Sequence, residues 1–89
     1  MQMYELTLIF EPDLTNDACD AIIEKLRIVL DSKEVWGKRL LAYHVKKWGE
    51  GIYYFIQTHG AGSGMKELER KLNLEGKILR YLLIAKEER

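Results

Sequence analysis

The sequence lacks an excess of charge of either sign, a second cysteine and any long apolar run, and it holds one proline. Its 14 lysines and arginines balance its 14 aspartates and glutamates, so the net charge is zero. Nucleic-acid-binding domains usually carry a basic excess, so any contact with nucleic acid must come from a local group of basic residues. The lone cysteine, Cys19, excludes an internal disulfide, and we interpret it as a small buried side chain.

Segments that would direct the chain to or across a membrane are also missing. No stretch approaches the roughly 20 apolar residues that a spanning helix needs. The first residues lack the basic start and apolar run of a signal peptide. We therefore predict a soluble, intracellular protein without membrane contact.

Groups of residues that could carry out catalysis are absent too. The two histidines, His44 and His59, have no serine, cysteine or paired carboxylate nearby in a recognisable arrangement, and no spacing suggests a metal site. The glycines of residues 60–64 lack the lysine of a P-loop and the spacing of a dinucleotide fingerprint. We predict no enzymatic activity, no cofactor, no metal and no small-molecule substrate, and we interpret residues 59–64 as a flexible linker.

The hydrophobic pattern indicates six secondary-structure elements in one domain, residues 1–89. Strands are expected at residues 4–10, 35–48, 52–58 and 78–86, with helices at 16–30 and 65–73 and a turn at 49–51. The order strand, helix, strand, strand, helix, strand is that of the α+β ferredoxin-like split βαβ fold (βαββαβ). We predict a four-stranded antiparallel sheet with both helices on one face.

Alternation along each strand assigns side chains to the two faces of this sheet. The core face of the first strand is predicted to hold Tyr4, Leu6, Leu8 and Phe10, and that of the second strand Arg39, Leu41, Tyr43 and Val45. The face away from the helices would then display Ile9, Tyr53, Phe55, Tyr81 and Leu83. An apolar patch of this size indicates a protein partner. Stacking of the rings on nucleic-acid bases is the other interpretation.

Basic residues gather at both ends of the apolar run in residues 36–47. Lys38 and Arg39 follow Gly37, and Lys46 and Lys47 follow Val45. They could hold an anion or polyanion beside the sheet, or they could simply keep an edge strand soluble.

Three separated motifs resemble those of the small-subunit ribosomal protein S-six family, which is found in bacteria and in organelles. The first is the strand Tyr4-Glu5-Leu6-Thr7-Leu8-Ile9-Phe10 with Pro12, and the second is Gly37-Lys38-Arg39-Leu40-Leu41-Ala42-Tyr43-His44-Val45-Lys46. The third pairs Leu68-Glu69-Arg70-Lys71-Leu72 with Leu79-Arg80-Tyr81-Leu82-Leu83. The resemblance covers nearly the whole chain, although His44 stands where the family frequently has proline.

The resemblance implies a structural role in the platform of the small ribosomal subunit, where family members bind small-subunit ribosomal RNA together with ribosomal protein S-eighteen. It makes Lys38, Arg39, Lys46 and Lys47 the candidate RNA contacts, and the apolar open face the candidate protein contact. It also implies a location on the ribosome, either cytoplasmic or organellar. Two alternatives remain: a stand-alone single-strand RNA-binding module, and a dimeric ferredoxin-like ligand-binding or enzyme domain.

Overall fold

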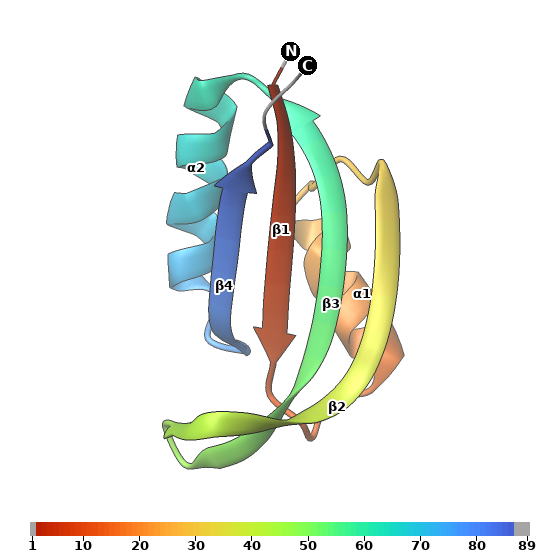
Figure 1. Ribbon diagram of the computed structural model, residues 1–89, viewed down its shortest axis with the longest axis vertical. Helices are drawn as coiled ribbons and strands as arrows, with labels where there is room; N and C mark the ends of the chain where they lie inside the picture. Colours follow the sequence, from red (N-terminus) through yellow and green to blue (C-terminus); the bar gives the residue numbers. More distant parts are fainter. Residues whose placement is uncertain (1, 87–89) are drawn as a thin grey trace.

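The computed structural model describes residues 2–86 and contains one four-stranded sheet and two helices in that range (Figure 1). The elements are β1 (Gln2–Phe10), α1 (Asn16–Lys25), β2 (Ser32–Val45), β3 (Trp48–Gly60), α2 (Gly62–Leu74) and β4 (Ile78–Ala85). Neighbouring strands are antiparallel, in the order β2-β3-β1-β4. The predicted ferredoxin-like fold is confirmed.

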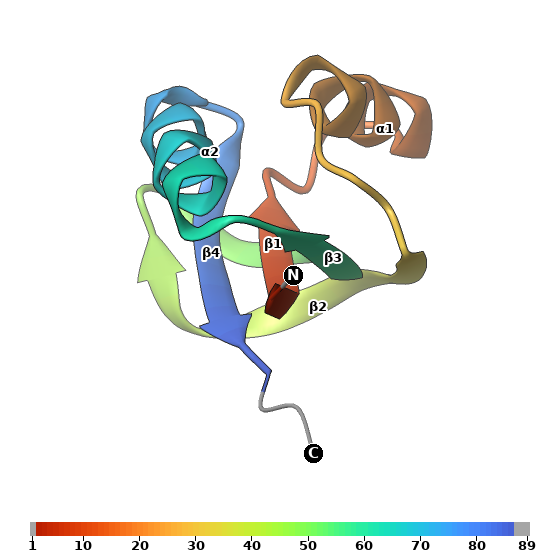
Figure 2. The same cartoon turned by 90° about the horizontal axis from the view of Figure 1, so that it is seen from above.

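Both helices cover the same face of the sheet, as the view from above shows (Figure 2). The core between the two layers is built from the alternate residues of the two central strands: Leu6, Leu8 and Phe10 of β1, and Ile52, Tyr54 and Ile56 of β3. The rings of Phe10 and Tyr54 meet edge to face, with their centroids 5.3 Å apart. The predicted core face of β1 is therefore correct from Leu6 onward, and Tyr4 is half-buried at its end.

Helix α1 starts where the sequence predicts and ends five residues earlier. The Thr15 hydroxyl caps it by accepting a hydrogen bond from the Ala18 N–H at 3.1 Å. Arg27 takes a left-handed conformation with φ of 57°, and this terminates the helix after Lys25. Residues Val29 and Leu30, predicted to lie on the apolar stripe, are consequently exposed outside the helix.

Strand β2 is the outer strand beside β3, and its predicted core face is wrong. None of Arg39, Leu41, Tyr43 and Val45 is buried, and Tyr43 is 78% exposed. The register shifts between Val35 and Gly37, where Gly37 has a φ of +77°. Such a bulge bends the strand and increases its twist, so the second half of β2 leaves the plane that the helices cover.

The hairpin turn lies at Lys46–Lys47, and the predicted turn at residues 49–51 is wrong. Lys46 supplies the left-handed conformation, with φ of 57°, so no glycine is needed there. Gly51 instead lies inside β3, where an added Cβ would come within 2.5 Å of the Ile9 Cγ2 atom. The glycine is required there for close packing between strands.

Residues 59–64 form ordered structure, so the predicted linker is also wrong. His59 and Gly60 end β3, Ala61 is the N-cap of α2, and the helix begins at Gly62. Glycine is unfavourable inside a helix but is tolerated in its first turn, and composition alone suggested a loop.

In strand β4, the side chains that face the helices are the ones predicted to lie on the open face. Tyr81 pairs with Leu8, and Leu83 pairs with Leu6, so both face the helices together with these core residues. The Tyr81 hydroxyl donates a hydrogen bond to Asn73 Oδ1 of α2 at 3.1 Å. Tyr81 and Leu83 therefore do not belong to the open face.

Candidate binding surfaces

A row of three aromatic rings runs along the face of the sheet opposite the helices. The Trp36 and Phe55 ring centroids are 4.4 Å apart, and those of Phe55 and Tyr53 are 6.4 Å apart. The bulge at Trp36–Gly37 places the indole on this row, where its Nε1–H donates to Glu34 Oε1 at 2.9 Å. All three rings remain partly accessible, so they can contact a partner.

The rest of this open face is aliphatic near β4 and polar near the N-terminal end of β1. Leu82 and Ile84 pair with Thr7 and Glu5, which places them on the open face, and they are 56% and 49% exposed. At the polar end, Lys86 Nζ donates to Gln57 Oε1 at 3.0 Å. The open face thus consists of an aromatic and aliphatic centre with a charged border at one end.

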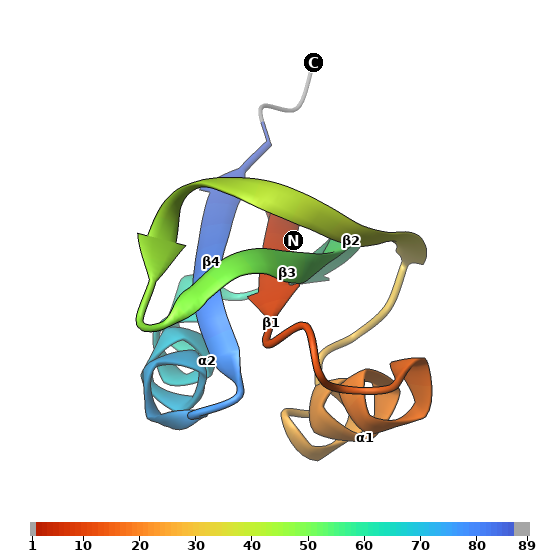
Figure 3. The same cartoon turned by 90° about the horizontal axis from the view of Figure 1, so that it is seen from below.

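The β2–β3 hairpin continues beyond the sheet as an arm, here defined as residues 38–51. Seen from below, the arm crosses the end of the sheet, with β2 on the side away from the helices and the tip turned back toward α2 and β4 (Figure 3). Its residues Leu41 and Val45 line a groove of about 200 Å³ together with Ile9, Tyr53 and Arg80 of the sheet. The arm therefore covers the end of the open face where Ile9 and Tyr53 lie, and leaves Phe55 and Trp36 outside the groove.

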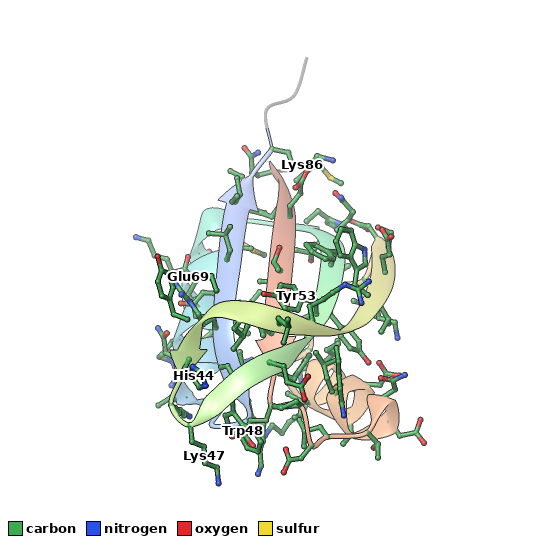
Figure 4. The ribbon with its side chains drawn as sticks, turned by 60° about the horizontal axis from the view of Figure 1, so that its bottom comes forward. His44, Lys47, Trp48, Tyr53, Glu69 and Lys86 are labelled. Carbon is green, nitrogen blue, oxygen red and sulfur yellow. The ribbon has the colours of Figure 1, made fainter. Side chains whose placement is uncertain are left out.

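Two of the predicted basic residues lie at the turn of the arm. His44, Lys47 and Trp48 come together there, at the end of the hairpin (Figure 4). Lys47 Nζ lies 5.1 Å from the centre of the Trp48 ring, a cation–π contact that keeps the ammonium at the surface. Lys46 Nζ donates to the Gly76 carbonyl at 3.3 Å, which joins the tip of the arm to the turn between α2 and β4.

The other two basic residues lie at the base of the arm and point to opposite sides of β2. Lys38 pairs with Ile52, which faces the core, and Arg39 pairs with Gly51. The Arg39 guanidinium lies 5.8 Å from the centre of the Trp36 ring, so it extends the aromatic row with a positive charge. The four basic residues therefore form a pair at each end of the arm, separated along the strand by as much as about 26 Å.

Sequence reasoning missed four contributors to the open face. Trp36 lies there because of the bulge, which the isolated glycine at position 37 could have indicated. Leu82, Ile84 and Arg80 lie there because of the phase of β4, and Arg80 follows from its pairing with Ile9. A strand that is apolar at nearly every position gives no signal for its phase.

The buried titratable groups lie on the other side of the sheet. Burial, followed by the charge of Asp20, raises the pKa of the Cys19 thiol to about 11. Burial, followed by the neighbouring Cys19 and Asp20, raises the pKa of Tyr54 well above its ordinary value. Both groups stay neutral near pH 7, so the thiol is a structural core residue.

The described residues contain no cluster of metal-ligating side chains and no helix able to cross a bilayer. No three of the histidines, cysteines, aspartates and glutamates among residues 2–86 come together as a metal site. Neither helix in this range has the length and apolar character required to span a membrane.

Comparison with known proteins gives one consistent result. The chain is 33% identical to small ribosomal subunit protein bS6 of Moorella thermoacetica, over 99% of this chain and 97% of that protein. It is 37% identical to the bS6 protein of Streptomyces griseus, over 98% of each. The crystal structure of 30S ribosomal protein S6 from Thermotoga maritima superposes with a TM-score of 0.83 at 25% identity, covering 96% of this chain and 87% of the other. Since the family model of ribosomal protein S6 also matches residues 3–85, the chain belongs to the ribosomal protein S6 family of the small ribosomal subunit.

Proposed function

We propose that this protein binds small-subunit ribosomal RNA in the platform of the small subunit and does so together with ribosomal protein S-eighteen. Membership of a family of structural ribosomal proteins supports this. The observation that supports separate contacts for RNA and for protein is that the basic tip of the arm and the apolar open face are separate surfaces. The arm holds basic side chains at its tip, whereas the open face is aromatic and aliphatic around Trp36 and Phe55.

In this proposal the tip of the arm contacts RNA phosphates. Lys47 is exposed beside Trp48, and Lys46 is exposed in the turn. A contact of this kind positions the protein on the RNA and is mainly electrostatic. Each phosphate neutralised contributes about 0.9 to the slope of log affinity against log salt concentration for duplex nucleic acid. With zero net charge, few such contacts are available, which favours binding assisted by a partner.

The open face contacts the partner protein. Burial of the aromatic row against a complementary surface removes partly exposed rings from water, and rings of this type commonly dominate interface energies. Arg39 lies beside Trp36 and supplies a charged group at the edge of the same contact. Lys38, whose strand position faces the helix side, contacts RNA from the base of the arm in this proposal.

The RNA contact is tested with a purified fragment of the central domain of the ribosomal RNA. The double variant Lys46→Glu/Lys47→Glu should bind the fragment, in the presence of S-eighteen, at least about tenfold more weakly and with a shallower salt dependence. A change of charge at Lys66, which is exposed on α2, is the matched control and should leave binding unchanged. Equal losses in the variant and the control would contradict an RNA contact at the tip.

The partner contact is tested by removing one ring from the open face. Phe55→Ala should weaken binding to S-eighteen by at least about tenfold, because an aromatic anchor is lost from the interface. Leu74→Ala, on an exposed side chain of α2 (72% exposed), should have no effect. If Phe55→Ala instead weakened binding to single-stranded RNA in the absence of any partner protein, the stand-alone RNA-binding function would replace this proposal.

A further inference from the structure

A pocket opens on the helix side of the sheet, away from the arm and the open face. It lies between the end of α1 and the start of α2 and has a volume of about 330 Å³, within the range of roughly 300–1,000 Å³ that is usual for small-molecule sites. Leu26, Ile28, Met65 and Leu68 form its apolar part. Its lining residues come from the end of α1 and the segment after it, from β3 and from α2; Figure 2 shows the two helices on the same side of the sheet.

Thr58, one of the residues that line this pocket, carries a buried hydroxyl without a partner. Thr58 is 1% exposed, and within residues 2–86 its Oγ1 atom has no hydrogen-bond partner. A buried polar atom that pairs with nothing is unfavourable by roughly 1–3 kcal/mol, so a water molecule or ligand that pairs with it would be stabilising. The hydroxyl can donate one hydrogen bond and can also accept.

The start of α2 adds donors at the same pocket. Gly64 lines the pocket in the first turn of the helix, where backbone N–H groups have no partner within the helix. The N-cap residue Ala61 has no side chain to accept from them, and the first turn contains no acidic residue. These N–H groups and the helix dipole favour an anion.

Charged side chains around the pocket leave a positive balance. Arg27, in the segment that follows α1, and Lys71 of α2 line it, and His59 lies at its edge with Nδ1 at 2.8 Å from Asp31 Oδ2. Glu67 also lines the pocket, but its two carboxylate oxygens accept hydrogen bonds from Arg70 at 3.1 and 2.5 Å. The one carboxylate that lines the pocket is therefore already paired.

We propose that this pocket binds a small aliphatic carboxylate. Its carboxylate accepts hydrogen bonds from the Thr58 hydroxyl and the Gly64 N–H, and its hydrocarbon chain packs on Leu26, Ile28 and Met65. This binding is a property beyond the proposed ribosomal role. Since the pocket and the arm lie on opposite faces of the sheet, either assignment can fail without the other.

Hexanoate is the probe, and two related molecules separate its charge from its chain. Hexanol has the same chain without the carboxylate, and acetate has the carboxylate with almost no chain. Titrated into the full-length protein, hexanoate should shift the backbone N–H resonances of Gly60, Gly62 and Gly64 in the NMR spectrum. Both other molecules should bind at least about tenfold more weakly, because each lacks one half of the contacts.

The variant Thr58→Val removes the hydroxyl while keeping the shape of the side chain. It should weaken hexanoate binding about tenfold, the effect of one lost hydrogen bond to a charged group. Thr7→Val, the same change on the open face, should leave hexanoate binding unchanged, and both variants should retain the dispersed spectrum of the folded protein. The proposal is overturned if hexanol binds as tightly as hexanoate, if Thr58→Val binds hexanoate normally, or if the shifts fall on the arm.

Discussion

The two faces of the sheet come from the same strands and differ in almost every physical respect. On the helix side, Leu8, Phe10 and Tyr54 are completely buried, and the buried ionisable groups, Cys19 and Tyr54, stay neutral near pH 7. On the other side, Tyr53 and Phe55 alternate with these residues along the chain but are only half-buried. Because successive residues of a strand point to opposite faces, one sequence supplies both a dry core and a partly exposed apolar surface.

This difference separates stability from binding. The helix side should determine whether the protein folds, and the open face and arm should determine what the folded protein contacts. Large losses of stability are expected only where a buried group is removed or a tight contact between strands is disturbed. The predictions below compare matched substitutions on or near the two faces, from the largest expected effect to the smallest.

The two phenylalanines of the chain allow the most direct comparison of stability. Phe10→Ala should lower the free energy of unfolding by roughly 3–5 kcal/mol, because it leaves a cavity beside Tyr54. Phe55→Ala should lower it by only about 1 kcal/mol, since its ring is half-exposed and loses mainly its contact with Trp36. Urea unfolding of both variants measures the difference. Equal losses would mean that the open face is part of the core.

Close packing where the arm leaves the sheet is tested at a glycine. Gly51→Ala would bring its Cβ within 2.5 Å of Ile9 Cγ2 and 3.1 Å of the Phe10 carbonyl oxygen. We expect a destabilisation of about 1–3 kcal/mol, typical of overpacking. Gly62→Ala, where nothing lies within 4 Å, should instead be neutral or stabilising by up to about 1 kcal/mol. Thermal unfolding distinguishes them, and a harmless Gly51→Ala would contradict the strand packing described here.

Alkaline pH should lower the free energy of unfolding through the ionisable groups buried on the helix side. Burial raises the pKa of the Cys19 thiol from its ordinary 9.0 to about 11, so the folded state holds more protons than the unfolded state between these values. Its contribution to stability is present below pH 9 and is lost as the pH rises to about 11, with a slope of at most about 1.4 kcal/mol per pH unit. Tyr54 acts in the same direction at higher pH. Unfolding measured from pH 8 to 11 tests this.

The matched variant for this experiment is Cys19→Ala, which removes the titrating thiol and should flatten the decline between pH 9 and 11. The same thiol should react with a water-soluble thiol reagent only as fast as the protein unfolds, because it is fully buried. A fast reaction in the native state would show that Cys19 is accessible.

The smallest effect is expected for the ion pair between Lys25, at the end of α1, and Glu75, which follows α2. Hydrogen bonding from Lys25, 2.5 Å away, lowers the pKa of Glu75 below its ordinary 4.5. Glu75→Gln should reduce stability by less than about 1 kcal/mol at neutral pH, because Lys25 is largely exposed to solvent. A carboxyl group whose pKa is lowered by folding stabilises the folded protein at pH values above its ordinary pKa. This contribution is lost as the pH falls through its pKa in the folded state. The difference between Glu75→Gln and wild type should therefore disappear in acid.

Alternation and motif order were sufficient to predict the fold and the central strands. Strands β1 and β3 alternate clearly between apolar and polar positions, so Ile9, Tyr53 and Phe55 were placed on the correct face. The motif order led to the ribosomal family and to a location on the small ribosomal subunit. The similarity to bacterial small-subunit proteins confirms both.

The outer strands were harder to predict, for two physical reasons. Strand β4 is apolar at nearly every position, so Tyr81 and Leu83 were assigned to the wrong face. In β2, the bulge at Gly37 interrupts the period of two, and the arm beyond it packs across the end of the sheet rather than under a helix. The turn formed by Lys46 with a positive φ could not be predicted while two glycines, Gly49 and Gly51, followed it.

The central claim is that the open face and the arm hold the protein on the small subunit and that the helix side does not. The most direct test is sedimentation of tagged protein in a gradient of host lysate at moderate salt. Wild type and Leu74→Ala should migrate with small subunits, and the triple variant Lys46→Glu/Lys47→Glu/Phe55→Ala should remain as folded free protein at the top. The reverse result, with the triple variant on the subunit and Leu74→Ala free, would contradict the claim.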